Sequence, residues 1–311
     1  MLRLLSRRVI AAAVLLVVIT AVTFVLTSLV PDPVLHVLDA TASPEQIAAK
    51  RHELGLDRPV TARYLDWLSG AIGGDLGVSW FTGVPVAATI AARLPITLSL
   101  ALIATVVSAV VGVGFGMAAA IRRGPLDRAL QAVSALGFAV PGMWIALLLV
   151  IVFAIRLRWF PATGYVPMTE DPGEWARSLV LPVAAIAVGS VAAVAAQTRS
   201  AVAGVLAQDY IRTLRGRGLP RHRLLRHVLR NAAPAALTVV SLQFIGLLGG
   251  AIVVEQIFAI QGLGSLATAG SSRSDIPVVL GVVVVGVLIV LAVNLVVDLL
   301  VGWLDPKVRR R

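Results

Sequence analysis

Residues 276–297 read IPVVLGVVVVGVLIVLAVNLVV, and no Asp, Glu, Lys or Arg interrupts them. A helix needs roughly 20 mostly apolar residues to cross about 30 Å of hydrocarbon, so this stretch is long enough to span a bilayer. Similar uncharged runs precede it at 9–30, 96–121, 129–155, 179–198 and 232–254. None of the runs shows the roughly 10-residue alternation of an outer-membrane barrel strand. We therefore expect an all-α integral membrane protein with about six transmembrane helices.

The composition supports a membrane protein. Of the 311 residues 58% are hydrophobic and 14% are charged, whereas soluble domains carry roughly 25% charged residues. The absence of cysteine excludes disulfides, thiolate metal sites and cysteine nucleophiles. Three arginines precede the first apolar run, as in a signal peptide, but this run is long and no small-x-small cleavage site follows it. We expect it to be retained as the first helix.

The arginines predict the orientation of the chain. Segments 1–8, 122–128, 199–231 and 298–311 hold 18 of the 27 Lys and Arg residues and only four acids. The other connections hold nine basic residues and 12 acids. Because cytoplasmic loops are enriched in Lys and Arg, both termini are expected in the cytoplasm of a multi-pass protein of the cell membrane. Anionic lipid and topology also explain the net charge of +11 more simply than nucleic acid does.

The first outer connection, 31–95, is expected to form short helices over the outer mouth of the bundle. Residues 43–46, SPEQ, are typical of a helix start, with a Ser cap, Pro at the first position and Gln at the third. Further along, one helical face would carry Tyr64, Trp67 and Leu68. The second outer connection, 156–178, contains several Pro and Gly residues and is predicted to be an irregular loop.

Two groups of residues inside the spans have two possible roles each. The first is Pro141–Gly142, which is interpreted first as a kink and second as a gate. The second is a set of small residues in the fifth span: Gly246, Gly249, Gly250 and Ala251. Close packing of helices is the favoured interpretation of this set. The alternative is a lining that leaves room for a substrate.

The longest inner connection is 208–234, QDYIRTLRGRGLPRHRLLRHVLRNAAP. Asp209 is expected to cap a short helix, which Gly216 and Gly218 end, and Pro220 is expected in the first turn of a second helix. In that second helix the apolar stripe and the arginines lie on different faces: Leu224, Leu225, Val228 and Leu229 against Arg223, Arg226 and Arg230. A basic amphipathic helix can rest on acidic lipid. The short Gly-terminated helix before it favours instead an elbow that inserts into a partner protein.

Here the sequence resembles a known family. DYIRTLRGRG at 209–218, followed by RHVLRNA at 226–232, is similar to the coupling loop of permeases of binding-protein-dependent ABC importers, in particular the dipeptide/oligopeptide/nickel branch. The similarity covers nearly the whole chain and includes LGLDRP at 54–59, GDLG at 74–77, RLPITL at 93–98, GLG at 262–264, NLVVD at 294–298 and LDP at 304–306. The chain departs from the family pattern at Leu214, Gly216, Arg217, Pro234 and Gln261.

The resemblance implies a type I ABC importer permease fold. Residues 1–311 would form a single transmembrane domain, with 31–95 as an extracytoplasmic insertion and 199–235 as the cytoplasmic coupling loop. This subunit would form half of a pathway for dipeptides or oligopeptides. The resemblance also implies four partners: a second homologous permease, cytoplasmic ATP-binding subunits, an extracytoplasmic substrate-binding protein and the lipid bilayer. The expected contacts with the ATPase are Asp209, Tyr210, Arg212, Thr213, Arg215 and Gly218.

No enzymatic or cofactor site is expected in this chain. A P-loop needs a Gly-Lys pair, and the two lysines, Lys50 and Lys307, follow Ala and Pro. ATP and Mg²⁺ would therefore bind to the partner subunits. His222 and His227 lie among arginines that would repel a metal cation. Three alternatives remain: a permease for nickel or another small solute, a stand-alone secondary transporter, and a membrane scaffold. A secondary transporter would need ionisable residues within the membrane, and the candidates are Glu255 and Asp298. Both lie near the ends of their spans and could snorkel to an interface.

Overall fold

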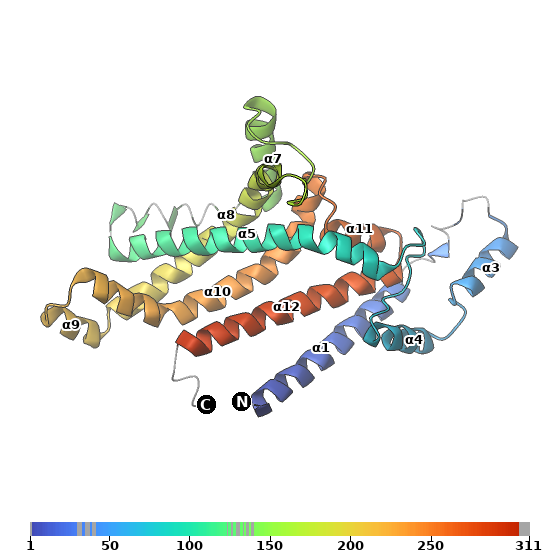
Figure 1. Ribbon diagram of the computed structural model, residues 1–311, viewed down its shortest axis with the longest axis horizontal. Helices are drawn as coiled ribbons and strands as arrows, with labels where there is room; N and C mark the ends of the chain where they lie inside the picture. The colour runs from blue at the N-terminus through green and yellow to red at the C-terminus, as the bar shows by residue number, and fades with distance from the viewer. Residues whose placement is uncertain are drawn as a thin grey trace. The chain divides into compact units, whose positions relative to one another are not determined.

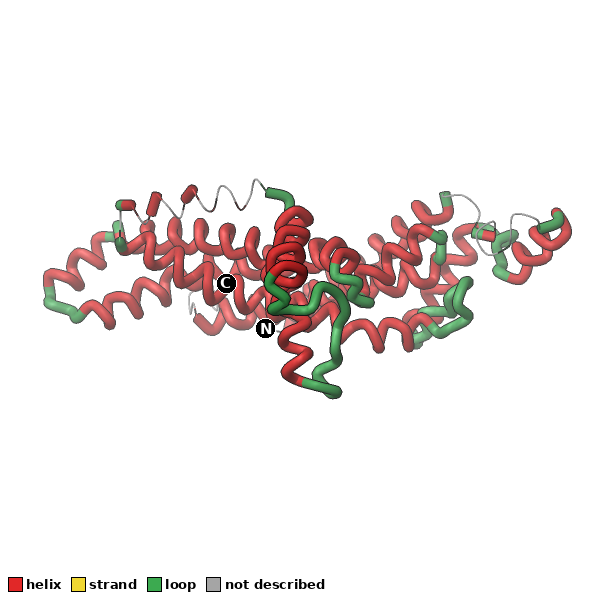
Figure 2. Tube along the Cα trace, turned by 90° about the horizontal axis from the view of Figure 1, so that it is seen from above, coloured by secondary structure: helices red, strands yellow, loops and turns green. Residues whose placement is uncertain are grey.

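The computed structural model describes residues 2–29, 33–34, 38, 42–122, 124–125, 127–128, 131–132, 134, 137 and 140–304. In these ranges nearly all regular structure is helical, and the pairing of Val78 with Pro85 is an isolated bridge (Figures 1 and 2). The elements are α1 Leu2–Ser28, α3 Pro44–Glu53, α4 Val60–Ile72, α5 Val86–Ile121, α7 Gly142–Leu149, the π-helical η1 Val150–Arg156, α8 Pro172–Leu206, α9 Asp209–Gly216, α10 Arg221–Ile257, α11 Leu263–Ser272 and α12 Ile276–Leu304.

Five of the described helices are long and apolar enough to cross a membrane: α1, α5, α8, α10 and α12. The span expected at 129–155 lies partly outside the described residues. Its second half forms α7 and η1, which together cover Gly142–Arg156. Pro141 precedes α7 with ψ 136°, outside the helical range, so α7 begins at Gly142. The kink predicted at Pro141–Gly142 stays a prediction, because most of the preceding span lies outside the described residues.

The chain divides into two compact units. The first consists of residues 1–95 and 261–291, and the second of residues 96–260 and 292–311.

In the first unit the predicted aromatic face of α4 packs against α1. The Tyr64 hydroxyl lies 3.0 Å from the Thr20 hydroxyl and donates a hydrogen bond to the Val17 carbonyl, also at 3.0 Å. The rings of Tyr64 and Trp67 stack with their centroids 6.2 Å apart, and the Arg63 guanidinium lies 5.5 Å from the centroid of Phe24. Burial lowers the pKa of this guanidinium below its ordinary value. Short helices are thus confirmed within residues 31–95, as α3 and α4.

Helix α3 begins as the sequence predicts. The Ser43 hydroxyl accepts a hydrogen bond from the amide of Gln46 at 3.3 Å, and the Gln46 side chain accepts one from the amide of Ser43 at 2.8 Å. Pro44 occupies the first helical turn. This capping box satisfies two backbone donors that the helix itself leaves unpaired.

In the second unit α8 and α10 pack along each other, and α7 lies against both (Figure 1). Helix α5 approaches α8 closely through Gly112 and Gly116. A Cβ atom at Gly112 would lie 2.7 Å from Cβ of Val194, and one at Gly116 would lie 2.8 Å from Cβ of Thr198. Small residues four apart allow the backbones of membrane helices to approach in this way.

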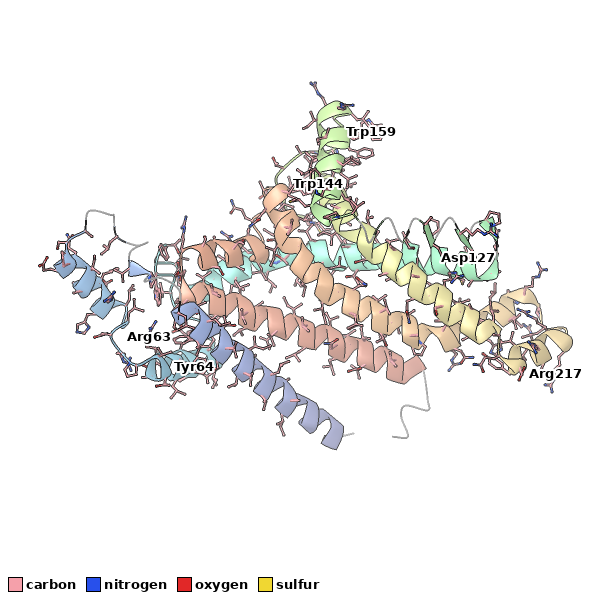
Figure 3. The ribbon with its side chains drawn as sticks, turned by 180° about the vertical axis from the view of Figure 1, so that it is seen from behind. Arg63, Tyr64, Asp127, Trp144, Trp159 and Arg217 are labelled. Carbon is pink, nitrogen blue, oxygen red and sulfur yellow. The ribbon has the colours of Figure 1, made fainter. Side chains whose placement is uncertain are left out.

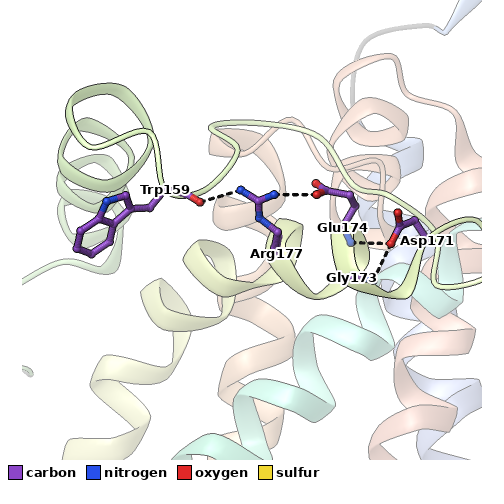
Figure 4. A network of polar contacts seen from close by, with 5 residues as sticks. All are labelled: Trp159, Asp171, Gly173, Glu174 and Arg177. Carbon is purple, nitrogen blue, oxygen red and sulfur yellow. Dashed lines mark hydrogen bonds and ion pairs between the residues drawn. The ribbon is translucent and has the colours of Figure 1, made fainter.

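The second outer connection is shorter than predicted, because α8 begins at Pro172 and not after Ser178. The Asp171 carboxylate accepts hydrogen bonds from the amides of Gly173 at 2.7 Å and Glu174 at 3.0 Å, and it caps the helix (Figure 4). Arg177 then pairs with Glu174 at 2.8 Å and donates to the Trp159 carbonyl at 3.2 Å. The cap and these contacts continue the helix into a segment that its Pro and Gly content had suggested was irregular.

The expectation that Glu255 snorkels to an interface is wrong. Its side chain is fully buried within the second unit, and its carboxylate accepts a hydrogen bond from the Thr97 hydroxyl at 2.7 Å. The other ionisable candidate, Asp298, is exposed.

Candidate functional site

The inner connection predicted to carry the function forms a helical elbow, defined here as residues 207–220. Helix α8 ends at Leu206, α9 spans Asp209–Gly216, and α10 begins at Arg221. Most of the predicted coupling loop 199–235 therefore belongs to helices, and only short bends are not helical. In Figure 1 the elbow lies at the end of the α8 and α10 pair, and Arg217 marks it in Figure 3.

The start of α9 corrects one prediction. Gln208, with ψ 144°, occupies the N-cap position, and no side chain caps the helix there. Asp209 is instead the first helical residue. Its carboxylate still lies in the first turn, where negative charge is favourable beside the positive end of the helix dipole.

The end of α9 confirms the predicted turn. The amide of Gly218 donates to the Arg215 carbonyl at 3.0 Å, and the amide of Leu219 donates to the Leu214 carbonyl at 3.2 Å. Gly218 has φ +72°, a left-handed conformation that glycine adopts without strain. Pro220 is the N-cap of α10, one position before the place predicted for it.

The elbow is anchored by an apolar cluster on its inner side. Ile211 is fully buried and packs in a cluster with Ala120 of α5, Val202 of α8 and Leu224 and Val228 of α10. Leu214 and Leu219 pack against the same cluster. Of the stripe predicted in α10, Leu224 and Val228 are buried in this cluster, whereas Leu225 and Leu229 are half-buried outside it. The arginines predicted on the other face are exposed. Burial of a side chain of this size contributes about 1.5–3 kcal/mol, so Ile211 fixes α9 to the helices that it joins.

The six residues predicted to contact an ATPase all lie on the exposed side of this anchor: Asp209, Tyr210, Arg212, Thr213, Arg215 and Gly218. Their polar contacts are local. The Tyr210 hydroxyl accepts a hydrogen bond from the Asn231 side chain at 2.7 Å, and the Thr213 hydroxyl donates to the Asp209 carbonyl at 3.2 Å. Asp209 and Arg212 approach to 3.6 Å, but their side chains are 96% and 78% exposed. Such an exposed pair contributes little, so both charges remain available to a partner.

A further ion pair joins α8 to a residue that follows α5 in the chain. The Arg199 guanidinium on α8 donates to both carboxylate oxygens of Asp127, one of them at 2.7 Å. Asp127 follows α5 in the chain and is marked in Figure 3. The sequence placed both residues in cytoplasmic segments, but nothing in their spacing indicated that they pair.

An apolar cavity of about 590 Å³ lies among α7, α8 and α10 in the second unit. Its walls include Pro141, Gly189, Gly246 and Gly250. No atom lies within 4 Å of a Cβ position at Gly246, Gly249 or Gly250. Close packing was the favoured interpretation of these glycines, but within the described chain they face open space. Ala251, the fourth member of the set, is fully buried, as close packing predicts. A lining that leaves room for a substrate stays a prediction for Gly246 and Gly250.

A single polar pair interrupts the otherwise apolar walls of this cavity. The Ser190 hydroxyl on α8 donates to the Gln243 side-chain oxygen on α10 at 3.3 Å. Neither residue is charged, and the described side chains that line the cavity carry no ionisable group. The cavity can accept a neutral or flexible solute without burying a fixed charge.

Comparisons of the whole chain give its family. Residues 111–310 match the family of binding-protein-dependent transport system inner membrane components. Residues 1–101 match the family that describes the N-terminal part of these membrane components. The chain is 36% identical to the oligopeptide transport system permease protein OppB of Mycobacterium bovis, over 99% of both chains. It is 34% identical to the permease protein AppB of the Bacillus subtilis oligopeptide transport system, over 97% of this chain and 98% of AppB. A Brucella abortus protein assigned to a peptide transport system as its permease is 40% identical over 98% of both chains.

A solved structure supports the fold. Inward-facing MetNI, a methionine ABC transporter, contains a chain that matches 70% of this one with a TM-score of 0.56 and 15% identity, and 96% of that chain is covered. The five long apolar helices of the described residues and the shorter Gly142–Arg156 segment agree with these matches. The chain belongs to the family of inner membrane components of binding-protein-dependent transport systems.

Proposed function

We propose that this chain is the transmembrane permease subunit of an ABC importer for dipeptides and oligopeptides, and that it forms half of the translocation pathway. Relatives that match almost the full chain are named as peptide or oligopeptide permeases. The distribution of arginines supports an orientation with both termini in the cytoplasm, which places the elbow on the cytoplasmic side.

The observation that carries the coupling role is the two-sided elbow. Helix α9 buries Ile211 against three other helices and presents Asp209, Arg212 and Arg215 to solvent. A helix held so firmly on one side transmits a push on its other side to α8 and α10. Dimerisation of ATP-binding subunits could thereby shift the bundle between two packed states.

The energy source belongs to partner subunits in this proposal. The sequence offers no Gly-Lys pair for a P-loop, so ATP and Mg²⁺ would bind to cytoplasmic ATPases that grip the elbow. A second homologous permease would complete the pathway, and an extracytoplasmic binding protein would deliver the peptide.

The cavity lined by Gly246 and Gly250 supports a role in the pathway. Its volume of about 590 Å³ is in the range of small-molecule pockets. The Ser190–Gln243 pair can exchange its hydrogen bond with a peptide amide, while the apolar walls do not select for one side-chain charge. Such a lining suits a transporter that accepts peptides of many sequences.

Uptake of labelled dipeptides and tripeptides tests the proposed function. A strain without other peptide importers is compared with and without this gene. Loss of ATP-dependent uptake on deletion, and its return with the gene, is expected. Unchanged peptide uptake would contradict the peptide assignment, and the same cells would then be tested with nickel and other small solutes.

A further inference from the structure

A second cavity lies wholly within the first unit, at the predicted extracytoplasmic side. It has a volume of about 450 Å³ and is bounded by the start of α5, the turn at 79–84, α11 and the junction of α11 with α12. Part of its wall is apolar, formed by Val84, Leu266, Ala269 and Val278. Two arginines, Arg93 and Arg273, also line it, although they are 180 positions apart in the sequence.

Neither arginine has an acidic partner among the described residues. Arg93 is half-buried, and its guanidinium donates a hydrogen bond to the Ser265 hydroxyl at 3.5 Å. The Arg273 guanidinium lies 5.8 Å from the centroid of the Phe81 ring, which holds the side chain beside the cavity. Both guanidinium groups therefore retain donors for a ligand.

The cavity also contains one acid, Asp275, which already has partners. Its side chain is 3% exposed, and one carboxylate oxygen accepts a hydrogen bond from the Ser79 hydroxyl at 2.6 Å. The other oxygen accepts one from the amide of Trp80 at 3.3 Å. Asp275 thus fixes the turn that forms one wall. Two guanidinium groups and one carboxylate leave one positive charge, which complements a single monovalent anion.

We propose that this cavity binds the C-terminal carboxylate of the transported peptide. Arginine is well suited to a carboxylate, because its planar donors match the two oxygens and charge assistance strengthens the hydrogen bonds. The apolar wall would receive the side chain of the last residue. Every linear peptide carries this carboxylate whatever its sequence, so the site would recognise the substrate class and not individual side chains. This inference rests on the proposed peptide function.

An acidic side chain of the binding protein offers the same chemistry. The geometry favours the peptide, because the two arginines line a hollow whose volume of about 450 Å³ has room for one residue. A stable protein–protein contact instead buries about 800 Å² on each partner. An experiment can distinguish the two candidate ligands, the C-terminus of the peptide and the acidic side chain of the binding protein.

The first measurement uses the intact membrane complex in nanodiscs, purified without its binding protein. Saturation-transfer NMR follows N-acetyl-dialanine as the free acid and as the C-terminal amide, with acetate as a competitor. We expect saturable binding of the acid, at least ten-fold weaker binding of the amide, and loss of acid binding in the double variant Arg93→Gln, Arg273→Gln. Arg58→Gln is the matched control, because Arg58 lies in the same unit but pairs with Asp66 at 2.6 Å on the surface.

Equal binding of acid and amide, or acid binding that survives in the double variant, would overturn the proposal. Arginine-dependent binding of acetate without binding of the peptide acid would assign the site to another carboxylate and would also overturn it. Uptake of labelled dialanine by cells is measured in parallel. Failure of the wild type to take up dialanine would contradict the proposed function, whereas normal uptake by the double variant would contradict only the role of this cavity.

Discussion

Gly218 shows at the scale of one residue why the elbow requires glycine. Its φ of +72° lies in the left-handed region, where a side chain costs roughly 1–2 kcal/mol. No atom lies within 4 Å of a Cβ position at Gly218, so the backbone conformation and not space is the constraint.

Gly218→Val should therefore distort the turn between α9 and α10 and reduce ATP-dependent peptide uptake at least several-fold, while the protein still inserts into the membrane. Uptake and membrane levels are measured together. Gly216→Val is the matched control, because Gly216 also has open space around its Cβ position but has no positive φ. Normal uptake by Gly218→Val would show that the turn is not needed for coupling.

Ile211 anchors the elbow through burial. Ile211→Ala removes most of a fully buried side chain, and truncations of this kind cost about 2–5 kcal/mol. We expect faster hydrogen exchange of the α9 amides and weaker coupling of ATP hydrolysis to uptake. Thr213→Ala, on the exposed side of the same helix, should leave the exchange of the other α9 amides close to that of the wild type. Equal exchange in the two variants would contradict the anchoring role.

At the scale of helices, the sequence predicted those helix starts and ends that are determined by residues adjacent in the chain. The SPEQ box of α3 and the glycine turn after α9 are local devices, so their residues suffice to identify them. A similar helix-start signal is present at the beginning of α8, in Asp171, Pro172 and Glu174. It was not recognised, because the surrounding residues are rich in Pro and Gly. Gln208 took the cap position expected for Asp209, a shift of one residue at a helix boundary.

Contacts between distant segments could not be predicted in the same way. Thr97 and Glu255 are 158 positions apart, and Arg199 and Asp127 are 72 apart. A single sequence indicates that such residues are polar but not which of them meet. The six coupling residues, which were predicted from the resemblance to the permease family, are all exposed. Their exposure agrees with the packing of α9, which turns Ile211 and Leu214 toward the apolar cluster.

The contact of α5 with α8 gives a prediction at this scale. Gly116→Leu places a side chain where Thr198 and Ala195 leave no room, and overpacking typically costs 1–3 kcal/mol or more. We expect a lower thermal denaturation temperature and less monodisperse protein after extraction. Gly114→Leu, two residues away with open space around its Cβ position, is the control. A Gly116→Leu protein as stable as Gly114→Leu would contradict the close approach of α5 and α8.

At the scale of the whole molecule, the predicted orientation can be tested by labelling introduced cysteines, because the chain has no cysteine of its own. Ser69→Cys in α4 and Ser200→Cys in α8 introduce single thiols at exposed positions. An impermeant maleimide added to intact cells should label Ser69→Cys, whereas Ser200→Cys should react only after the membrane is permeabilised. The reverse pattern would overturn the orientation with both termini inside.

The central claim is that the exposed side of α9 receives a cytoplasmic ATP-binding subunit. The most direct measurement places a photo-crosslinking amino acid at Arg212 in the assembled importer and identifies the captured protein by mass spectrometry, with Ser69 as the outer control. We predict capture of the ATP-binding subunit from Arg212 and not from Ser69, with a yield that changes when ATP is added. Capture of lipid alone from Arg212, in a complex that still contains the ATPase, would contradict the coupling role of the elbow.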